Sequence, residues 1–362
     1  MPALHADDLT ALARGAAVLG TGGGGDPHIG KLMAQQALAE YGTVQMVAPQ
    51  DLPDDACVLP VAMMGAPTVM VEKLPSADQI VVAVQSLARY LGVRPTHVAS
   101  IEAGGINSII PIVAAAQLGL PLVDGDGMGR AFPELQMVLP TLFGVDATPM
   151  AIVDEKGNRG VLDTIDNAWA ERLARTATVE MGCSTIVCLY AMTGAQVRES
   201  FVPGTLSRAM AIGRAIEDAR RELRDPVKTV VEILGGRQIV SGKVIDVSRR
   251  TTTGFARGEA TLDGLDEHTG RRLVLRFQNE HLIAELDGEP VVTTPDLIVV
   301  LDRETGEPIT TEALRYGHRV SVLGAPCDDR WHEPAGIDLV GPRYFGYDID
   351  PVRVWTGRTE AA

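Results

Sequence analysis

The stretch PTHVASIEAGGINSIIPIVAAAQLGLPLVDGDG, residues 95–127, has the pattern of a strand, a glycine-rich loop, a helix and a second strand. The first strand is expected to end at Glu102, the helix to span 106–119, and the second strand to run into a loop within 120–127. Apolar strands at 44–49 and 56–65 precede it. Nearly continuous apolar strands between helices are typical of a sheet that helices cover on both faces. The sequence therefore predicts an α/β fold for this half.

The pattern changes from about residue 165 onward. Segments 167–182 and 207–223 have helical periodicity, and from Gly235 short strands alternate with Gly and Asp-Gly turns. Many short strands at this spacing indicate a second domain that resembles a barrel or a sandwich. We place the domains at 1–168, an α/β N-terminal domain, and 169–362, a C-terminal domain with a helical entry followed by a β-barrel-like part.

Composition excludes several classes of protein. The chain of 362 residues has 46% hydrophobic residues, which is ordinary for a globular protein, and its net charge of -15 with dispersed Lys and Arg argues against nucleic acid or an anionic membrane as a partner. Four cysteines are too few for a disulfide scaffold in a chain of this length. The N-terminus lacks the pattern of a signal peptide, and no apolar run reaches the ~18 residues of a spanning helix. We expect a cytoplasmic protein.

Four consecutive glycines, Gly22–Gly25, lie in VLGTGGGGDPHIGKL, residues 18–32. A helix should precede them, at 7–18, and another should follow, with Asp26 as N-cap, Pro27 first and Gly42 at its end. GDPHIGK resembles a P-loop, but Leu32 stands where Ser or Thr must hold magnesium, so no nucleotide is expected.

Two interpretations of the glycines remain. They are either a joint that lets helices cross closely, or free amides that bind an anion or a polarised carbonyl. We favour the second, because polyglycine is destabilising in regular structure and needs a reason. Gly23, Gly24, Gly25 and Asp26 are then expected to bind the ligand. His28 would point at that ligand as an acid, a base or a metal ligand.

Carboxylates follow two of the predicted strands. Glu102 stands at one strand end with Asn107 behind it, and Asp124 and Asp126 stand at another with Arg130 close by. The D-x-D-G pattern is not an EF-hand, because Met128 occupies the fifth position and the twelfth-position Glu is absent. Each of these acids is either a capping residue of a turn or part of a ligand site at the sheet edge.

Other polar residues give weaker signals. Cys183 is the better candidate for a reactive thiol, although inert burial is favoured. Asn279, Glu280 and His281 interrupt an apolar strand, and an exposed face is favoured over the domain cleft. His97, His268, His281, His318 and His332 have no paired spacing and receive no role.

These motifs together resemble the S-methyl thiohydantoin desulfurase family, which is often associated with hydantoinase/oxoprolinase-type proteins. The resemblance rests on LGTGGGGDPHIGKLMA, MGAPTVMVEK, IEAGGINS, VDGDGMGRAFPELQM, GTLSRAMAIGRAI, FQNEHLIAELDG and TTPDLIVVLDRETGEPI, and it covers about residues 7–355. It implies a three-layer α/β N-terminal domain and a C-terminal domain built on a small β-barrel. It also implies a hydrolase that releases methanethiol from an S-methyl thiohydantoin and leaves a hydantoin.

The chemistry of that reaction suggests roles for the residues above. Asp124 or Asp126 would act as base, with Glu102 as second choice, and His28 would protonate the leaving group or the ring. Amides of Gly23–Gly25 and the Asn107 side chain would hold ring oxygen and nitrogen. Arg130 would either bind a substrate carboxylate or pair with Glu134.

Three alternatives stay open. His28, Asp124 and Asp126 would hold a divalent metal that activates water, or Cys183 would be a nucleophile. In the third, the chain is an accessory subunit of a hydantoinase/oxoprolinase-type enzyme without chemistry of its own. The sequence does not decide between a homo-oligomer and association with a hydantoinase-type protein.

Overall fold

The computed structural model describes residues 2–65, 77–252 and 254–354. Within them, the first half of the chain contributes most of a nine-stranded sheet with the order β1-β2-β5-β4-β3-β9-β7-β8, and β10 pairs with β3. β2, β5, β4 and β3 are parallel, and β9, β7 and β8 continue the sheet antiparallel. The strands are β1 (Ala3–Leu4), β2 (Val44–Val47), β3 (Cys57–Gly65), β4 (His97–Ala99), β5 (Leu122–Val123), β7 (Met150–Val153), β8 (Arg159–Leu162), β9 (Ser184–Cys188) and β10 (Met192–Thr193).

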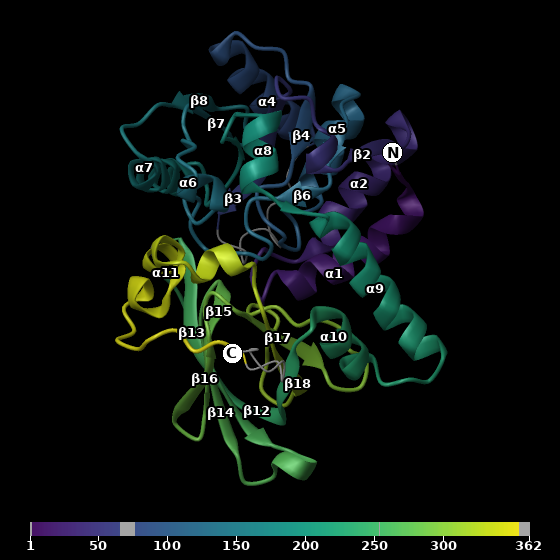
Figure 1. Ribbon diagram of the computed structural model, residues 1–362, viewed down its shortest axis with the longest axis vertical. Helices are drawn as coiled ribbons and strands as arrows, with labels where there is room; N and C mark the ends of the chain where they lie inside the picture. The colour runs from purple at the N-terminus through teal and green to yellow at the C-terminus, as the bar shows by residue number, and fades with distance from the viewer. Residues whose placement is uncertain (1, 66–76, 253, 355–362) are drawn as a thin grey trace, which may run out of the picture.

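Helices cover both faces of this sheet, as the apolar strands predict (Figure 1). Side chains alternate along a strand, so in β3 Leu59 and Val61 enter one apolar core and Val58 and Ala62 the other. The first core contains residues of α1, α2, α4 and α5, and the second contains residues of α6, α7 and α8. These helices are α1 (Leu9–Leu19), α2 (Pro27–Tyr41), α4 (Ala77–Leu91), α5 (Ile110–Leu118), α6 (Leu139–Leu142), α7 (Asn167–Glu180) and α8 (Gly194–Ser200).

Helix α2 begins and ends as the sequence predicts. The Asp26 side chain accepts a hydrogen bond from the backbone N–H of His28 at 2.8 Å, Pro27 occupies the first helical position, and Gly42 ends the helix with φ 89°. A carboxylate at this position satisfies a backbone donor that the helix leaves free. The role of Asp26 seen here is therefore that of a helix cap.

The C-terminal region forms an antiparallel sheet that curls into a half-barrel. Its order is β16-β15-β14-β13-β12-β18-β17, and β17 lies against β15 and β16 without a ladder closing the barrel. A third apolar core lies within it. The strands are β12 (Arg237–Thr252), β13 (Phe255–Gly264), β14 (Arg272–Gln278), β15 (Glu280–Leu286), β16 (Glu289–Thr293), β17 (Leu297–Asp302) and β18 (Arg319–Ala325). The α/β class with a barrel-like C-terminal part is confirmed.

The two halves share elements. β9 and β10 lie after residue 168 in the chain and yet pair with β3 in the first sheet. The proposed domain boundary at 168 stays a prediction. A small pair joins β6 (Gly125–Asp126) to β11 (Val202–Pro203). α9 (Thr205–Arg221) lies along α1 (Figure 1). The remaining α-helices among the described residues are α10 (Pro226–Leu234) and α11 (Pro334–Val340). No helix in the described residues is long and apolar enough to cross a membrane.

Candidate active site

A cavity of about 90 Å³ lies where the first sheet meets the half-barrel. Its wall combines the end of β3, the loop after β4, the glycine turn before α2, and the turn between β14 and β15. Because β3 and β4 are parallel, their carboxyl ends meet at the edge where α/β sheets bind ligands. The polar or glycine residues on the wall are Gly24, Gly25, Gly65, Glu102, Asn107, Glu134, Arg175, Asn279 and Glu280.

The glycine turn packs directly against a second glycine pair. A Cβ added at Gly24 would lie 2.6 Å from Gly104 Cα, and one added at Gly105 would lie 2.1 Å from the Gly25 carbonyl oxygen. The Ile106 N–H donates to the Gly24 carbonyl at 2.8 Å, which closes the contact. On the other side, a Cβ at Gly23 would lie 1.9 Å from Glu280 Oε1. A side chain at Gly24 or Gly105 would therefore collide with the backbone of the facing glycines, and one at Gly23 would collide with the Glu280 carboxylate.

Replacing Gly105 by Ala tests this contact. Its new methyl group would meet the backbone, which cannot rotate away, so we expect a loss of about 1–3 kcal/mol in the free energy of unfolding. Gly160→Ala is the matched control, because the nearest atom to its added Cβ is 3.8 Å away. Urea unfolding of both variants measures the difference. Equal stability of Gly105→Ala and the parent chain would contradict the close approach.

Two backbone amides of the turn remain available to a ligand. Gly24 and Gly25 line the cavity, and within the described residues no acceptor is found for either backbone N–H. Both residues have positive φ, 72° and 74°, a conformation that glycine adopts without strain. The turn therefore supports the interpretation that these glycines offer free amides to a ligand. The same glycines also allow the close packing described above.

Glu102 is held by an amide that is itself fixed. Asn107 Oδ1 accepts from the Met63 N–H at 2.7 Å and its Nδ2 donates to the Met63 carbonyl at 3.1 Å, which sets the orientation of the amide. The same Nδ2 donates to Glu102 Oε1 at 2.7 Å. Strand β3 thus positions Asn107, and Asn107 positions the Glu102 carboxyl group on the cavity wall.

Burial raises the pKa of Glu102 from 4.5 to about 7, opposed by the Asn107 hydrogen bond and reinforced by the charge of Asp126. Asp126 is fully buried behind the wall, and its Oδ1 accepts from the N–H groups of Met128 and Gly129. Burial raises its pKa to about 6. Asp126 thus lies near the site and acts on Glu102 through charge, without lining the cavity.

A second carboxyl group, that of Glu280, lines the same cavity from the half-barrel side. It is 2% exposed, and its Oε2 has no hydrogen-bond partner among the described residues. Burial, with the charge of Glu102 as the next cause, raises the pKa of Glu280 well above its ordinary value, while Arg130 opposes the rise. Two like charges in one buried site disfavour double ionisation, which is the arrangement expected of an acid and a base that work together.

The sequence assigned Glu280 no role, and its preferred exposed face for Asn279, Glu280 and His281 is wrong. All three are buried. Asn279 accepts from the Ala256 N–H at 2.9 Å, and both ring nitrogens of His281 lack a partner among the described residues. The signal was present, because three polar residues interrupt an apolar strand, but only the packing of the two domains shows which face is covered.

Four other predicted site residues lie elsewhere. Asp124 caps α9: its Oδ1 accepts from the N–H groups of Leu206 and Ser207, at 3.1 and 3.0 Å. His28 and Asp26 are exposed and line a separate groove beside α1.

Arg130, the fourth, is fully buried and is engaged with the protein itself. Its guanidinium donates to the carbonyls of Pro295 and Asp296 at 2.6 and 2.8 Å and to Thr21 Oγ1 at 2.9 Å. The alternatives of a substrate carboxylate and a pair with Glu134 both lack support in this geometry.

The predicted metal set is not brought together. His28 is exposed on α2, and Asp124 and Asp126 accept hydrogen bonds from backbone amides. In the described residues, the one group of potential metal-ligating side chains that lie close together is Asp296, Cys327 and His332. Cys183 is half-buried and is not among the residues that line the cavity.

Two protein-family models together match nearly the whole chain. The model of the S-Me-THD-like N-terminal domain matches residues 7–164, and that of the S-Me-THD-like C-terminal domain matches residues 165–354. The chain belongs to the S-Me-THD-like family. This confirms the resemblance to S-methyl thiohydantoin desulfurases, and the family name indicates an enzyme with desulfurase activity.

A solved structure supports the fold of this S-Me-THD-like protein. The X-ray crystal structure of a protein from Chromobacterium violaceum matches with a TM-score of 0.78 and 23% sequence identity, over 98% of this chain and 99% of that chain. At this identity the likeness shows the fold alone. No match was found among curated proteins.

Proposed function

We propose that this S-Me-THD-like protein hydrolyses an S-methyl thiohydantoin in the cavity between its two domains, releasing methanethiol and leaving a hydantoin. The observation that carries the proposal is the pair of buried carboxyl groups, Glu102 and Glu280, beside the amides of Gly24 and Gly25. Two carboxyl groups that share one proton supply a base and an acid at the same pH. The family name points to the same reaction.

In this mechanism Glu102 is the base. With a pKa of about 7 it is partly ionised at neutral pH, and it takes a proton from the water that attacks the ring carbon bearing the methylthio group. A C–O bond forms while Glu280, protonated, gives its proton to the neighbouring ring nitrogen of the C=N bond. The product of this step is a tetrahedral intermediate.

The second step restores both residues. The C–S bond breaks, Glu102 returns its proton to the departing methanethiolate, and Glu280 takes the hydroxyl proton as the new carbonyl forms. Water and substrate are thus converted to methanethiol and hydantoin with no other reactant. The amides of Gly24 and Gly25 are suited to bind a ring oxygen, since preorganised N–H donors stabilise developing negative charge.

Methanethiol release by the isolated chain tests the proposal. A panel of S-methyl thiohydantoins should yield the thiol and the hydantoin in equal amounts, while an open-chain S-methyl isothiourea should react far more slowly. Absence of turnover on every ring compound would overturn the proposal. Turnover that appears only after a hydantoinase/oxoprolinase-type protein is added would favour the accessory role instead.

The pH dependence of kcat/KM gives a further prediction. Activity should rise with pH through about 7 as Glu102 ionises, and should fall at higher pH where Glu280 loses its proton. Initial rates of methanethiol release across the pH range measure both limbs. A profile that stays level through neutral pH would remove Glu102 from the role of base.

A further inference from the structure

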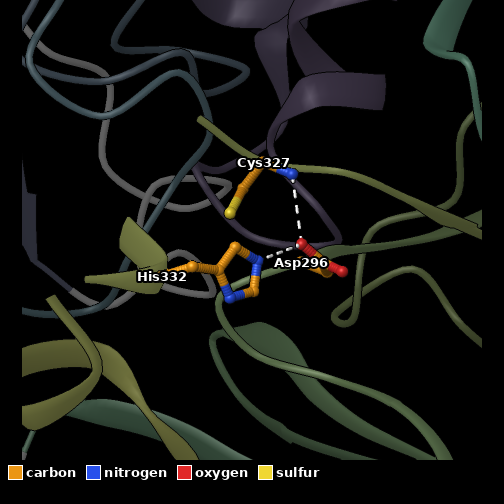
Figure 2. A group of neighbouring side chains, drawn as sticks. All are labelled: Asp296, Cys327 and His332. Atoms are coloured by element: carbon orange, nitrogen blue, oxygen red, sulfur yellow. Dashed lines mark hydrogen bonds and ion pairs between the residues drawn. The ribbon is translucent and has the colours of Figure 1, made fainter. Parts of the chain in front are cut away.

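Three side chains of different chemistry meet at one end of the half-barrel, outside the cavity. Asp296 precedes β17 and Cys327 follows β18, and these strands pair antiparallel with Leu297 opposite Ala325. His332 ends the 3₁₀ turn Asp329–His332. Figure 2 shows the thiol, the imidazole and the carboxylate turned toward one another, and one potential ligand atom from each lies within 4.8 Å of the other two.

The surrounding contacts hold this group in place. Asp296 Oδ1 lies 2.8 Å from His332 Nε2 and accepts from the Cys327 N–H at 3.2 Å, and its Oδ2 accepts from the Val354 N–H at 2.7 Å. Trp331, next to His332, is fully buried and donates to the Met128 carbonyl at 2.8 Å. The Asp296 and His332 side chains are 2% and 6% exposed, so the donors are preorganised and largely shielded from water.

We propose that Asp296, Cys327 and His332 bind one zinc ion or a divalent cation of similar softness. Sulfur, imidazole nitrogen and carboxylate oxygen together are the donor set that Zn²⁺ takes, whereas Mg²⁺ and Ca²⁺ prefer oxygen alone. Ligand atoms around a tetrahedral zinc lie about 3.3–3.8 Å apart. Asp296 Oδ1 and His332 Nε2 now lie 2.8 Å apart, closer than this, so an ion would replace their hydrogen bond and separate the two atoms. Three protein ligands leave one position open.

Charge at the site is compatible with a dication. The Cys327 thiol exchanges its proton for the metal, so the thiolate and the Asp296 carboxylate together balance two positive charges. The Arg130 guanidinium, which donates to the Asp296 carbonyl at 2.8 Å, adds one positive charge nearby and opposes the ion. Its other hydrogen bonds, to the Pro295 carbonyl and the Thr21 hydroxyl, fix the position of the guanidinium.

The ion would have a structural role. None of its three ligands lines the cavity. Asp296 instead links β17 to the chain near Val354, and the turn that carries His332 is anchored through Trp331 to the N-terminal half. Zinc would therefore fasten the C-terminal segment and the domain junction, and its loss should affect stability.

Metal analysis of the full chain tests the proposal. Protein produced with zinc and desalted should contain one zinc per chain by mass spectrometry. The chelator-treated protein should bind Co²⁺ with the near-ultraviolet thiolate band that reports sulfur ligation. Cys327→Ser should remove that band, and His332→Gln should weaken zinc binding by at least about 100-fold, since even outer partners of metal ligands contribute 10–100-fold. Zinc should raise the thermal midpoint of the parent chain but not that of Cys327→Ser or His332→Gln.

Cys183→Ser is the matched control, because this cysteine is half-buried and lies outside the group. It should keep both the zinc and the cobalt band. Zinc content far below one per chain under zinc-replete conditions, or a cobalt complex of the parent chain without the sulfur band, would overturn the proposal and leave only the hydrogen bond between Asp296 and His332. The parent spectrum decides even if Cys327→Ser fails to fold.

Discussion

Replacing Glu102 by Gln is expected to lower kcat for methanethiol release by roughly 10²–10⁴, the usual contribution of a general base. Glutamine keeps the oxygen that accepts from Asn107 at 2.7 Å, so the side chain should stay in place. It cannot take a proton from water. The remaining activity should also lose the rise through about pH 7 that follows ionisation of Glu102.

Two measurements separate lost chemistry from lost structure. Glu180→Gln, an exposed residue at the end of α7, is the matched control and should leave kcat unchanged. The circular dichroism spectrum of Glu102→Gln should equal that of the parent chain. A kcat within a few-fold of the parent value would exclude Glu102 as the base.

The same variant should be more stable than the parent at alkaline pH. The folded protein raises the pKa of Glu102 from 4.5 to about 7, so it favours the protonated form. This contribution to stability is present below about pH 4.5 and is lost as the pH rises through about 7, on the order of 3 kcal/mol in all. Glutamine cannot ionise. Urea unfolding should therefore show a gain of that order above pH 7 and little difference at acid pH.

Replacing Glu280 by Gln is the second large expected effect, a fall in kcat of roughly 10²–10⁴. The mechanism places the proton on Glu280, and burial together with the charge of Glu102 raises the pKa of this carboxyl group well above its ordinary value. Glutamine has nearly the shape of a protonated glutamate and still donates a hydrogen bond, but it transfers no proton. The alkaline fall in kcat/KM should disappear along with the rate.

The shape of the pH profile is the deciding readout for Glu280. A structural role alone would lower the rate and leave the alkaline limb where it was. The matched control is again Glu180→Gln, because Glu180 is exposed. A substitution of the nearby Gln278 by Glu would be unsuitable, since it would add a charge at a buried position. An unchanged alkaline limb in Glu280→Gln would assign that limb to another group.

Local signals in the sequence were sufficient for much of the fold. Asp26, Pro27 and Gly42 delimit α2 because capping and backbone conformation depend on a few neighbouring residues. The apolar run of β3 correctly predicts burial on both faces, since its alternate residues enter two separate cores. The first strand of the opening stretch ends at Ala99, three residues before the expected Glu102, because Glu102 belongs to the loop that lines the cavity.

The candidate site was only partly predictable. Gly24, Gly25, Glu102 and Asn107 line one cavity, as the sequence predicts for a ligand at the edge of an α/β sheet. Asp124 has the same glycine-flanked pattern as Asp126, yet it caps α9, more than 80 residues further along the chain. Sequence spacing shows that a carboxylate follows a strand, but the partner that it meets comes from a distant element.

By itself the sequence determined the α/β class, the capped helix after the glycines, the family resemblance and the candidacy of Glu102. Only the tertiary structure decided that Glu280 and Glu102 line one cavity, that Arg130 bonds to backbone carbonyls of the other domain, and that Asp296, Cys327 and His332 meet. The physical reason is that helix caps and strand periodicity arise from neighbours in the chain. A buried carboxyl pair, in contrast, depends on desolvation and charge that appear only when the half-barrel docks against the first sheet.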